Sequence, residues 1–447
     1  MKLIYNVETK PKDMGYLKTV LFALQQLLAI MAATILVPAI IGKGMSQTAA
    51  LFGAGIGTLV YLLFTKFKSP VFLGSSFAFL GSMGAAFAGG VSMSAGYLGL
   101  ILGALMAGLV YVILAIVVKV AGVSWINKLM PAVVIGPTVS IIGLSLAGNA
   151  VADLSKGAVS GVVTSPYVAL ICGLVTLFAT ILASVYGKKM ARMIPFIIGI
   201  VAGYLVATIF TVIGNITDNS ALLVIDFEKF NNITWVPDFT FLKAFSGDYN
   251  FGDAGSFGAY LGTIAVAYVP VAFVVFAEHI ADHKNLSSII EHDLLEEPGL
   301  HRTLLGDGIG SIAGSIFGGC PNTTYGESVG CVAISGNASV ATIIVTAIMA
   351  VLISFFGPFA TFLSTIPNCV MGGICVALYG FIAVSGLKML QKVDLGENRN
   401  LFVVSVILIT GIGGLTLKFG EITITSVACA LILGIITNIL VNCKKSK

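Results

Sequence analysis

Residues 319–330 read Gly-Cys-Pro-Asn-Thr-Thr-Tyr-Gly-Glu-Ser-Val-Gly and place Glu327 inside an otherwise apolar chain. A carboxylate in hydrocarbon is costly and is retained where it faces a partner, a cavity or a ligand. The neighbouring Pro, Thr, Gly and Ser residues also make this stretch a poor helix. Because irregular backbone at membrane depth is tolerated only where it is buried in protein or lines a cavity, the stretch predicts a binding site on a broken membrane segment.

The composition around this stretch is that of a polytopic membrane protein. Of the 447 residues, 57% are hydrophobic and 10% are charged, whereas a soluble domain carries roughly 25% charged residues. Apolar runs of about 20 residues recur, the length that a helix needs to cross a bilayer. The net charge of +4 is small, so the sequence predicts the lipid bilayer as a partner and no nucleic acid.

The seven cysteines contain no C-x-x-C pair and mostly lie in apolar runs: Cys172, Cys320, Cys331, Cys369, Cys375, Cys429 and Cys443. We interpret them as small core residues and predict no disulfide, no metal site and no cofactor. No cleavable signal peptide is visible, and residues 1–16 are expected to form a short cytoplasmic tail.

We predict an all-α polytopic membrane protein with about fourteen transmembrane segments. They are 17–41, 47–65, 70–89, 96–118, 130–150, 164–186, 190–214, 258–281, 302–318, 320–336, 338–358, 368–388, 400–417 and 422–442.

Basic residues alternate between the predicted loops. One set of loops carries Lys10, Lys12, Lys66, Lys68, Lys119, Lys128, Lys188, Lys189, Arg192, His301, Arg302, Lys388, Lys392, Lys444, Lys445 and Lys447. The opposite loops are nearly free of Lys and Arg or are acidic. Positive loops face the cytoplasm, which places both termini, including the tail 443–447, on that side and requires an even number of segments.

An acidic stretch at 215–257 is the longest predicted loop and is expected outside the cell. It divides the segments into two sets of seven, at 17–214 and 258–442. Because seven is odd, the second set must enter the membrane from the opposite side, which predicts two inverted repeats.

The third segment of each predicted repeat is interrupted in the same way. Residues 70–77 read Pro-Val-Phe-Leu-Gly-Ser-Ser-Phe and residues 321–328 read Pro-Asn-Thr-Thr-Tyr-Gly-Glu-Ser. Paired interrupted segments at matching positions are the best sequence indication of a transporter binding site. The alternative is that their small residues only allow close helix packing. Packing would explain Gly53, Gly57, Gly372 and Gly373, but it does not explain Glu327.

Two further acids end segment eight. Glu278 follows about twenty mostly uncharged residues, and Asp282 lies one turn later on the same helical face. Two partly desolvated acids repel when both are charged, so one of them is expected to hold an exchangeable proton. The alternative is that both are simply solvated at the membrane end. His279 and His283 are expected to be interfacial.

Polar residues elsewhere suggest supporting roles. Asp307 in segment nine is expected to support a neighbouring element, and buried amides at Gln25 and Gln26 need partners, expected in segment eight or ten. Carboxylates that accept N–H bonds, free backbone N–H groups, and aromatic faces at Phe77 and Tyr325 suit a cyclic imide such as a pyrimidine-2,4-dione. Another small planar amide or a neutral amino-acid-like solute fits the same physics.

Several sequence blocks occur together in a specific order. They are Leu24-Gln25-Gln26 with Ala33-Thr34-Ile35-Leu36-Val37-Pro38, Leu73-Gly74-Ser75-Ser76-Phe77-Ala78-Phe79, Ala277-Glu278-His279-Ile280, Asp293-Leu294-Leu295 with Pro298-Gly299-Leu300-His301-Arg302, and Pro321-Asn322-Thr323-Thr324-Tyr325-Gly326-Glu327. Over nearly its whole length the chain resembles the nucleobase–ascorbate transporter family, and within it the bacterial uracil:proton symporters.

The resemblance implies a fold of seven plus seven inverted repeats, with segments one to four and eight to eleven as a core domain and the others as a gate domain. It also implies short strands in segments three and ten and a homodimer. The substrate-binding residues would be Glu278, Glu327, Phe77, Ser76, Gly326, Ser328 and Tyr325. Glu278 and Asp282 would couple the proton, and Gln25, Gln26 and Asp307 would support the site.

The chain departs from the uracil symporters at several positions. Asp282 stands where they have a coupling His, Gln26 replaces a usual His, and Ser328 replaces a usual Asn. Glu327 favours uracil, because carriers of oxidised purines often have Gln at that place.

Together these features predict a proton-coupled symporter that imports a nucleobase, most directly uracil, across the cytoplasmic membrane. The alternative is a permease for xanthine or another oxopurine. Two other classes are disfavoured. An anion exchanger should show a basic site and often a cytoplasmic C-terminal domain, and an intramembrane aspartyl protease needs a second Asp aimed at Asp307. No enzyme is therefore predicted.

Overall fold

The computed structural model describes residues 3–122, 131–157, 159, 163–188, 191, 194–391, 393–419, 422–424 and 426–442. The predicted tail 443–447, with Cys443, lies outside these ranges. So do four more of the predicted loop cations, in addition to the lysines of that tail: Lys128, Lys189, Arg192 and Lys392.

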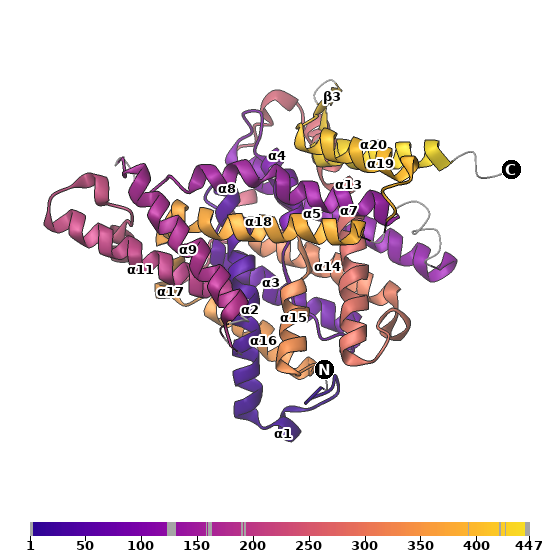
Figure 1. The fold of residues 1–447 in the computed structure, drawn as a ribbon, viewed down its shortest axis with the longest axis horizontal. Helices are drawn as coiled ribbons and strands as arrows, with labels where there is room; N and C mark the ends of the chain where they lie inside the picture. Colours follow the sequence, from indigo (N-terminus) through magenta and orange to yellow (C-terminus); the bar gives the residue numbers. More distant parts are fainter. Residues whose placement is uncertain are drawn as a thin grey trace. The chain divides into compact units, whose positions relative to one another are not determined.

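The helices form two compact units, one made of Met1–Ile142, Asp238–Leu352 and Ala383–Lys447, and one made of Gly143–Pro237 and Ile353–Ile382. Figure 1 labels most of these helices along the chain. The first unit contains α1 (Pro11–Met14), α2 (Tyr16–Ile41), α3 (Gln47–Phe64), α4 (Leu80–Ala86), α5 (Met93–Ala121), α12 (Thr240–Ala244), α13 (Phe257–Ile290), α14 (Leu300–Gly318), α15 (Gly326–Ser335), α19 (Asn398–Ile412) and α20 (Ser426–Asn442), together with α16 (Val340–Ile353) except for its last residue. The second contains α8 (Ala147–Asp153), α9 (Pro166–Tyr186), α11 (Pro195–Ile216) and α17 (Gly357–Thr365), while α7 (Ala132–Ser145) and α18 (Asn368–Leu390) belong partly to each.

Among the described residues, eight helices are long and apolar enough to cross a membrane, or nine if α16 and α17 count as one broken span. The chain is therefore a multi-pass membrane protein. Each of the predicted apolar segments contains at least one helix. The helices in segments three and ten are too short to count as spans, because these segments are interrupted. They hold the 7-residue α4 and the 10-residue α15.

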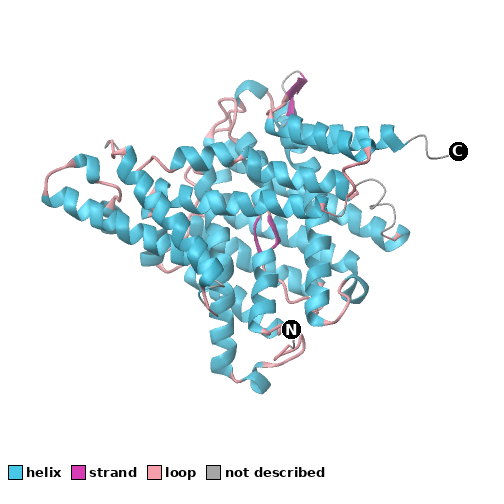
Figure 2. Ribbon diagram, viewed as in Figure 1, coloured by secondary structure: helices cyan, strands magenta, loops and turns pink. Residues whose placement is uncertain are grey.

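Two short strands replace helix in the interrupted segments. Strands β1 (Leu73–Ser75) and β2 (Asn322–Thr324) pair antiparallel, with Gly74 opposite Thr323, and Figure 2 shows them surrounded by helices. The one-turn helix η1 (Phe77–Phe79) follows β1, and α15 follows β2. Strands β3 (Leu417–Phe419) and β4 (Ile422–Ile424) form a second antiparallel pair.

Glycines bring α14 into close contact with α3 and α5. A Cβ atom on Gly57 of α3 would lie 2.7 Å from the carbonyl oxygen of Gly310, and one on Gly308 would lie 2.7 Å from Cβ of Tyr111 on α5. Small residues at such crossings let helix backbones come close together. Within a membrane, where the hydrophobic effect does not drive helices together, this close van der Waals packing stabilises their association. Helix α14 thus forms the centre of a three-helix layer beside β2.

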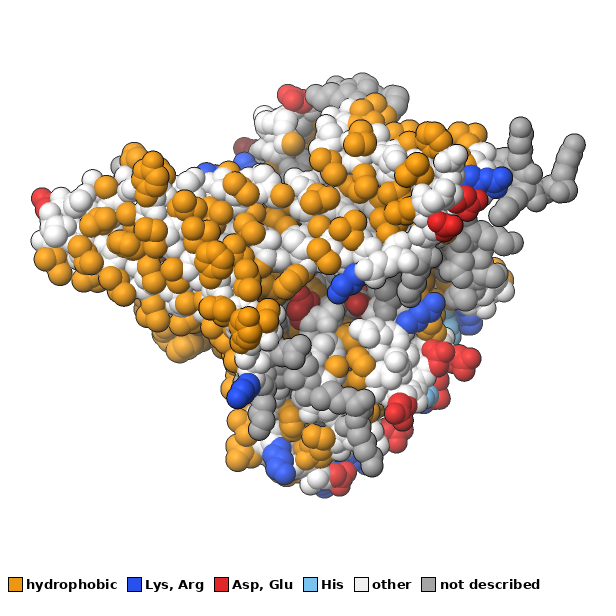
Figure 3. Space-filling view, viewed as in Figure 1, with side chains coloured by type: hydrophobic (Ala, Val, Ile, Leu, Met, Phe, Trp, Pro, Cys, Tyr) orange, Lys and Arg blue, Asp and Glu red, His pale blue; other side chains and the backbone are white. Residues whose placement is uncertain are grey.

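In the second unit, α9 and α11 pack through Gly199 and Gly203, which face Thr180 and Thr176. Their outer faces expose large apolar side chains, among them Phe178 and Leu205. Figure 3 shows this hydrophobic surface in orange. Such a continuous apolar surface suits lipid rather than water.

Candidate functional site

The strand pair is anchored by side chains from α3 and α14. Asn322 donates from its backbone N–H to Ser311 Oγ (3.0 Å) and from its amide Nδ2 to the Gly53 carbonyl (3.1 Å). On the other strand, Leu73 N–H donates to Thr58 Oγ1 (2.9 Å). Backbone groups that a helix would have satisfied are therefore paired within the protein, which is the condition for irregular structure at membrane depth.

Each strand leads into the start of a helix. Residue Phe77 begins η1, and Gly326 begins α15 with Glu327 in its first turn. The first N–H groups of a helix have no intrahelical partner and carry partial positive charge. The two helix starts therefore supply hydrogen-bond donors beside an acid, an arrangement that suits a polar ligand.

The predicted contact residues differ in exposure. Phe77, Glu278 and Glu327 are partly exposed and Gly326 is exposed, whereas Ser76 and Tyr325 are buried. The Tyr325 hydroxyl donates to the Ser75 carbonyl (2.6 Å) and so joins the start of α15 to β1. The partly exposed residues can reach a ligand directly, while the buried ones hold the backbone in place.

Ser328 is the clearest case of a buried support. Its hydroxyl is fully buried and receives hydrogen bonds from Gln26 Nε2 (2.6 Å) and from the backbone N–H of Phe72 (3.1 Å). A ligand contact by Ser328 would therefore use its backbone. Ser328 is therefore the partner in segment ten that was expected for Gln26. The neighbouring Gln25 is half-buried on α2.

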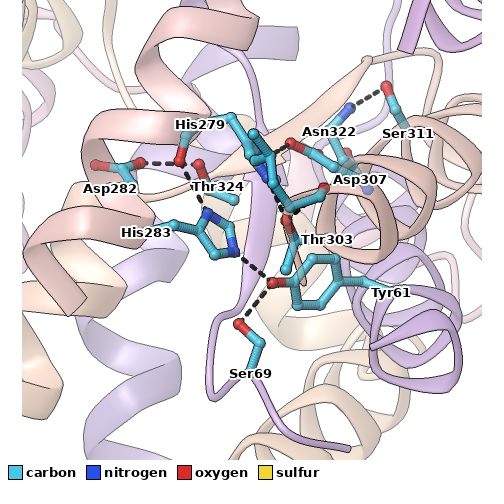
Figure 4. Close-up of polar contacts among 11 residues, drawn as sticks. Tyr61, Ser69, His279, Asp282, His283, Thr303, Asp307, Ser311, Asn322 and Thr324 are labelled. Carbon is cyan, nitrogen blue, oxygen red and sulfur yellow. Dashed lines mark hydrogen bonds and ion pairs between the residues drawn. The ribbon is translucent and has the colours of Figure 1, made fainter. Parts of the chain in front are cut away.

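The acids of α13 lie beside the start of α15. Asp282 Oδ2 accepts a hydrogen bond from Thr324 Oγ1 at 2.8 Å (Figure 4). Its other oxygen, Oδ1, lies 4.0 Å from the place where a Cβ on Gly326 would stand. Glu278, one turn earlier, lies within electrostatic reach of Asp282, Glu327 and Asp307. The structure thus groups these carboxylates from three helices.

The prediction that His279 and His283 are interfacial is wrong, because both side chains are fully buried. His279 Nδ1 is hydrogen-bonded to Asp307 Oδ2 (2.6 Å), and its Nε2 lies 3.0 Å from Thr303 Oγ1. The face of α13 that carries these histidines meets Tyr61 of α3, Tyr111 of α5 and Asp307 of α14 rather than water.

His283 continues this buried network. Its ring stacks on that of His279, with centroids 4.0 Å apart, and its Nε2 bonds to the Tyr61 hydroxyl at 2.8 Å, which in turn bonds to Ser69 Oγ at 2.6 Å (Figure 4). Sequence reasoning missed Tyr61, Thr303 and Thr324. The only available signal was their polarity within apolar segments.

Asp307 is almost fully buried and is hydrogen-bonded to His279. Its side chain therefore supports α13 and is not exposed to a ligand. Among the described residues, no group of three or more His, Cys, Asp or Glu side chains is arranged to hold a metal ion. What the geometry offers is three partly exposed carboxylates, at Glu278, Asp282 and Glu327, and two helix starts.

Comparison with known proteins places this geometry in a family. A family model described as a permease family matches residues 17–419. A uracil permease of Bacillus caldolyticus is 39% identical over 421 residues, covering 94% of this chain and 90% of the relative. The uracil permease of Escherichia coli (strain K12) is 33% identical, with the same coverage.

Solved structures with a similar fold are more distant in sequence. The transmembrane domain of the cyanobacterium bicarbonate transporter BicA has a TM-score of 0.62 at 16% identity, covering 95% of this chain and 98% of that one. The structure of SLC26A9 has a TM-score of 0.66 at 13% identity, covering 98% of this chain and 67% of that one. The two solved structures show only that their fold is similar to that of this chain. The family is shown by the matching family model and by the relatives that are 33–39% identical. The chain belongs to the permease family whose model it matches.

Proposed function

We propose that the chain is a proton-coupled symporter that imports uracil across the cytoplasmic membrane. The observation that carries this proposal is the meeting of Glu327, at the start of α15, with Glu278 and Asp282 on α13. Relatives named uracil permeases, 33–39% identical to this chain, support the substrate.

The chemistry of uracil fits the exposed groups. One of its two N–H groups would donate to the carboxylate of Glu327, and a hydrogen bond to a charged acceptor is worth roughly 1.5–3 kcal/mol. The other would donate to the carbonyl oxygen of protonated Glu278. Its carbonyl oxygens would accept from backbone N–H groups where η1 and α15 begin. The partly exposed ring of Phe77 would cover one face of the base.

The proton would be carried by the α13 acids. Glu278 is uncharged when it carries the proton and can then cross between the two membrane sides at lower cost. Asp282, tied to Thr324 on β2, would tune this protonation without touching the base. Because Thr324 lies three residues before Glu327, its bond to Asp282 connects the proton site to the element that holds the substrate.

We extend the proposal to the architecture. The fourteen predicted segments would form two inverted repeats divided into a core and a gate domain, with both termini in the cytoplasm, and the protein would act as a homodimer. The antiparallel pairing of β1 with β2, one from each interrupted segment, supports the repeat.

The proposal is tested by uptake of radiolabelled uracil into cells that lack their own uracil carriers. Unlabelled uracil should abolish uptake, whereas xanthine at equal concentration should leave it nearly unchanged. If xanthine competes as well as uracil, the protein is an oxopurine permease. A result in which neither base competes would remove the nucleobase assignment altogether.

A further inference from the structure

A separate pocket lies at one end of the helix layer formed by α3, α5 and α14. Its volume is about 340 Å³, and its apolar lining includes Phe64 at the end of α3, Ile116 on α5 and Leu305 on α14. The candidate substrate residues form no part of this lining. The pocket therefore requires an explanation of its own.

The remaining side chains that line this pocket are mostly basic. Lys119, in the last turn of α5, meets His301 and Arg302, in the first turn of α14. Within the described part of the chain, neither Lys119 nor Arg302 forms an ion pair, whereas Lys68 is paired with Glu297. Two permanent positive charges thus share a pocket without a carboxylate to balance them, which favours an anionic ligand.

An apolar stripe leads along α5 to this basic cluster. Its exposed members, spaced three or four residues apart, are Leu105, Leu109, Ile113, Ile116 and Val120. Residues at this spacing lie on one face of a helix. Since α5 is one of the membrane-spanning helices, this face is suited to acyl chains, and Ile116 belongs to both the stripe and the pocket.

We propose that this pocket binds the phosphate headgroup of an anionic phospholipid, whose acyl chains lie along the exposed face of α5. Lys119 and Arg302 would hold the phosphate oxygens, Arg through its planar fork and Lys as a point charge. Inorganic phosphate shares the charge but not the chains. The stripe that ends at the cations therefore favours the lipid.

The test uses the full chain purified in a neutral detergent, with retained lipids counted by native mass spectrometry after addition of phosphatidylglycerol or phosphatidylcholine. The parent should retain phosphatidylglycerol in preference to phosphatidylcholine. Because a cation near a membrane surface contributes roughly fivefold to binding of anionic lipid, Lys119→Gln with Arg302→Gln should reduce retention about 25-fold. Ile116→Trp, which fills the pocket without changing charge, should reduce it as well.

A matched control is Lys18→Gln with Lys388→Gln, because both lysines are exposed, neither lines the pocket, and the loss of charge is the same. This control should retain the lipid as the parent does. Equal losses in both double variants would reduce the effect to general surface charge and overturn the site.

A second arm measures the melting temperature with inorganic phosphate alone. If phosphate stabilises the parent as much as phosphatidylglycerol does, and only through Lys119 and Arg302, the pocket is a phosphate site and not a lipid site.

Discussion

Partial exposure distinguishes Glu278, Asp282 and Glu327 from the buried polar residues around them. Ser328, Asp307 and His279 are buried and bonded to protein partners, so their side chains maintain the fold of the site. The two glutamates have a surface that a ligand can reach. Substitutions at these two kinds of position should therefore differ in effect, reducing binding in one case and stability in the other.

We predict that Glu327→Gln weakens uracil binding by about tenfold to more than a hundredfold. The change removes a charged acceptor, and a charge-assisted hydrogen bond is worth roughly 1.5–3 kcal/mol. Binding is measured by isothermal titration on detergent-purified protein. Glu296→Gln is the matched control, because Glu296 is exposed in the short helix Leu295–Gly299, away from the candidate site. Parent-like affinity in a well-folded Glu327→Gln protein would assign Glu327 to the fold and move the site elsewhere.

At the scale of elements, the interrupted segments depend on their neighbours for stability. Strands β1 and β2 are three residues each, too short to be stable alone. Thr58 and Ser311 supply hydrogen bonds to their backbone from α3 and α14. The close approach of these two helices is therefore a condition for the shape of the site.

We predict that Gly57→Ala destabilises the protein by about 1–3 kcal/mol, the usual cost of overpacking. The added methyl group would lie 2.7 Å from the Gly310 carbonyl oxygen and against Asn322, which holds β2. Gly84→Ala in α4 is the control, because nothing lies within 4 Å of its Cβ position. Thermal unfolding followed by fluorescence measures both. An unchanged melting temperature for Gly57→Ala would mean that α3 and α14 can separate at no cost.

At the scale of the whole molecule, transport requires the proton site to be coupled to the substrate site. The hydrogen bond from Thr324 on β2 to Asp282 on α13 connects these two elements. A carrier driven by protons should accumulate uracil faster when the outside is acidic, and a protonophore should abolish accumulation.

We predict that Asp282→Asn leaves uracil affinity within about threefold of the parent but flattens the dependence of uptake on external pH. Asparagine keeps an oxygen that can accept from Thr324 and loses the titrating group. Thr324→Val is the control, since it removes the hydrogen bond and keeps the carboxylate. The measurement is uracil-driven proton movement in proteoliposomes. Accumulation that requires sodium and moves no protons would reassign these acids to a cation site.

The sequence alone was sufficient for the membrane class and for the presence of helix in the predicted apolar segments, and it singled out the acids that the structure groups in the candidate site. Apolar runs of spanning length, and the cost of a carboxylate among them, are local properties that can be read along the chain. Glu278, Asp282 and Glu327 stand out for this reason, as do the interruptions at Pro70 and Pro321.

Other features depend on which helix faces meet, and only the tertiary structure decided them. His279 and His283 lie one turn from the acids in sequence, yet they are buried because their face of α13 meets Tyr61 of α3 and Asp307 of α14, which bond to them. The engagement of Ser328 by Gln26 and the meeting of Lys119 with Arg302 likewise join residues far apart in the chain. Hydrophobic patterning is weak in helices that are apolar on all sides, so it does not specify such contacts, and they arise from close packing in three dimensions.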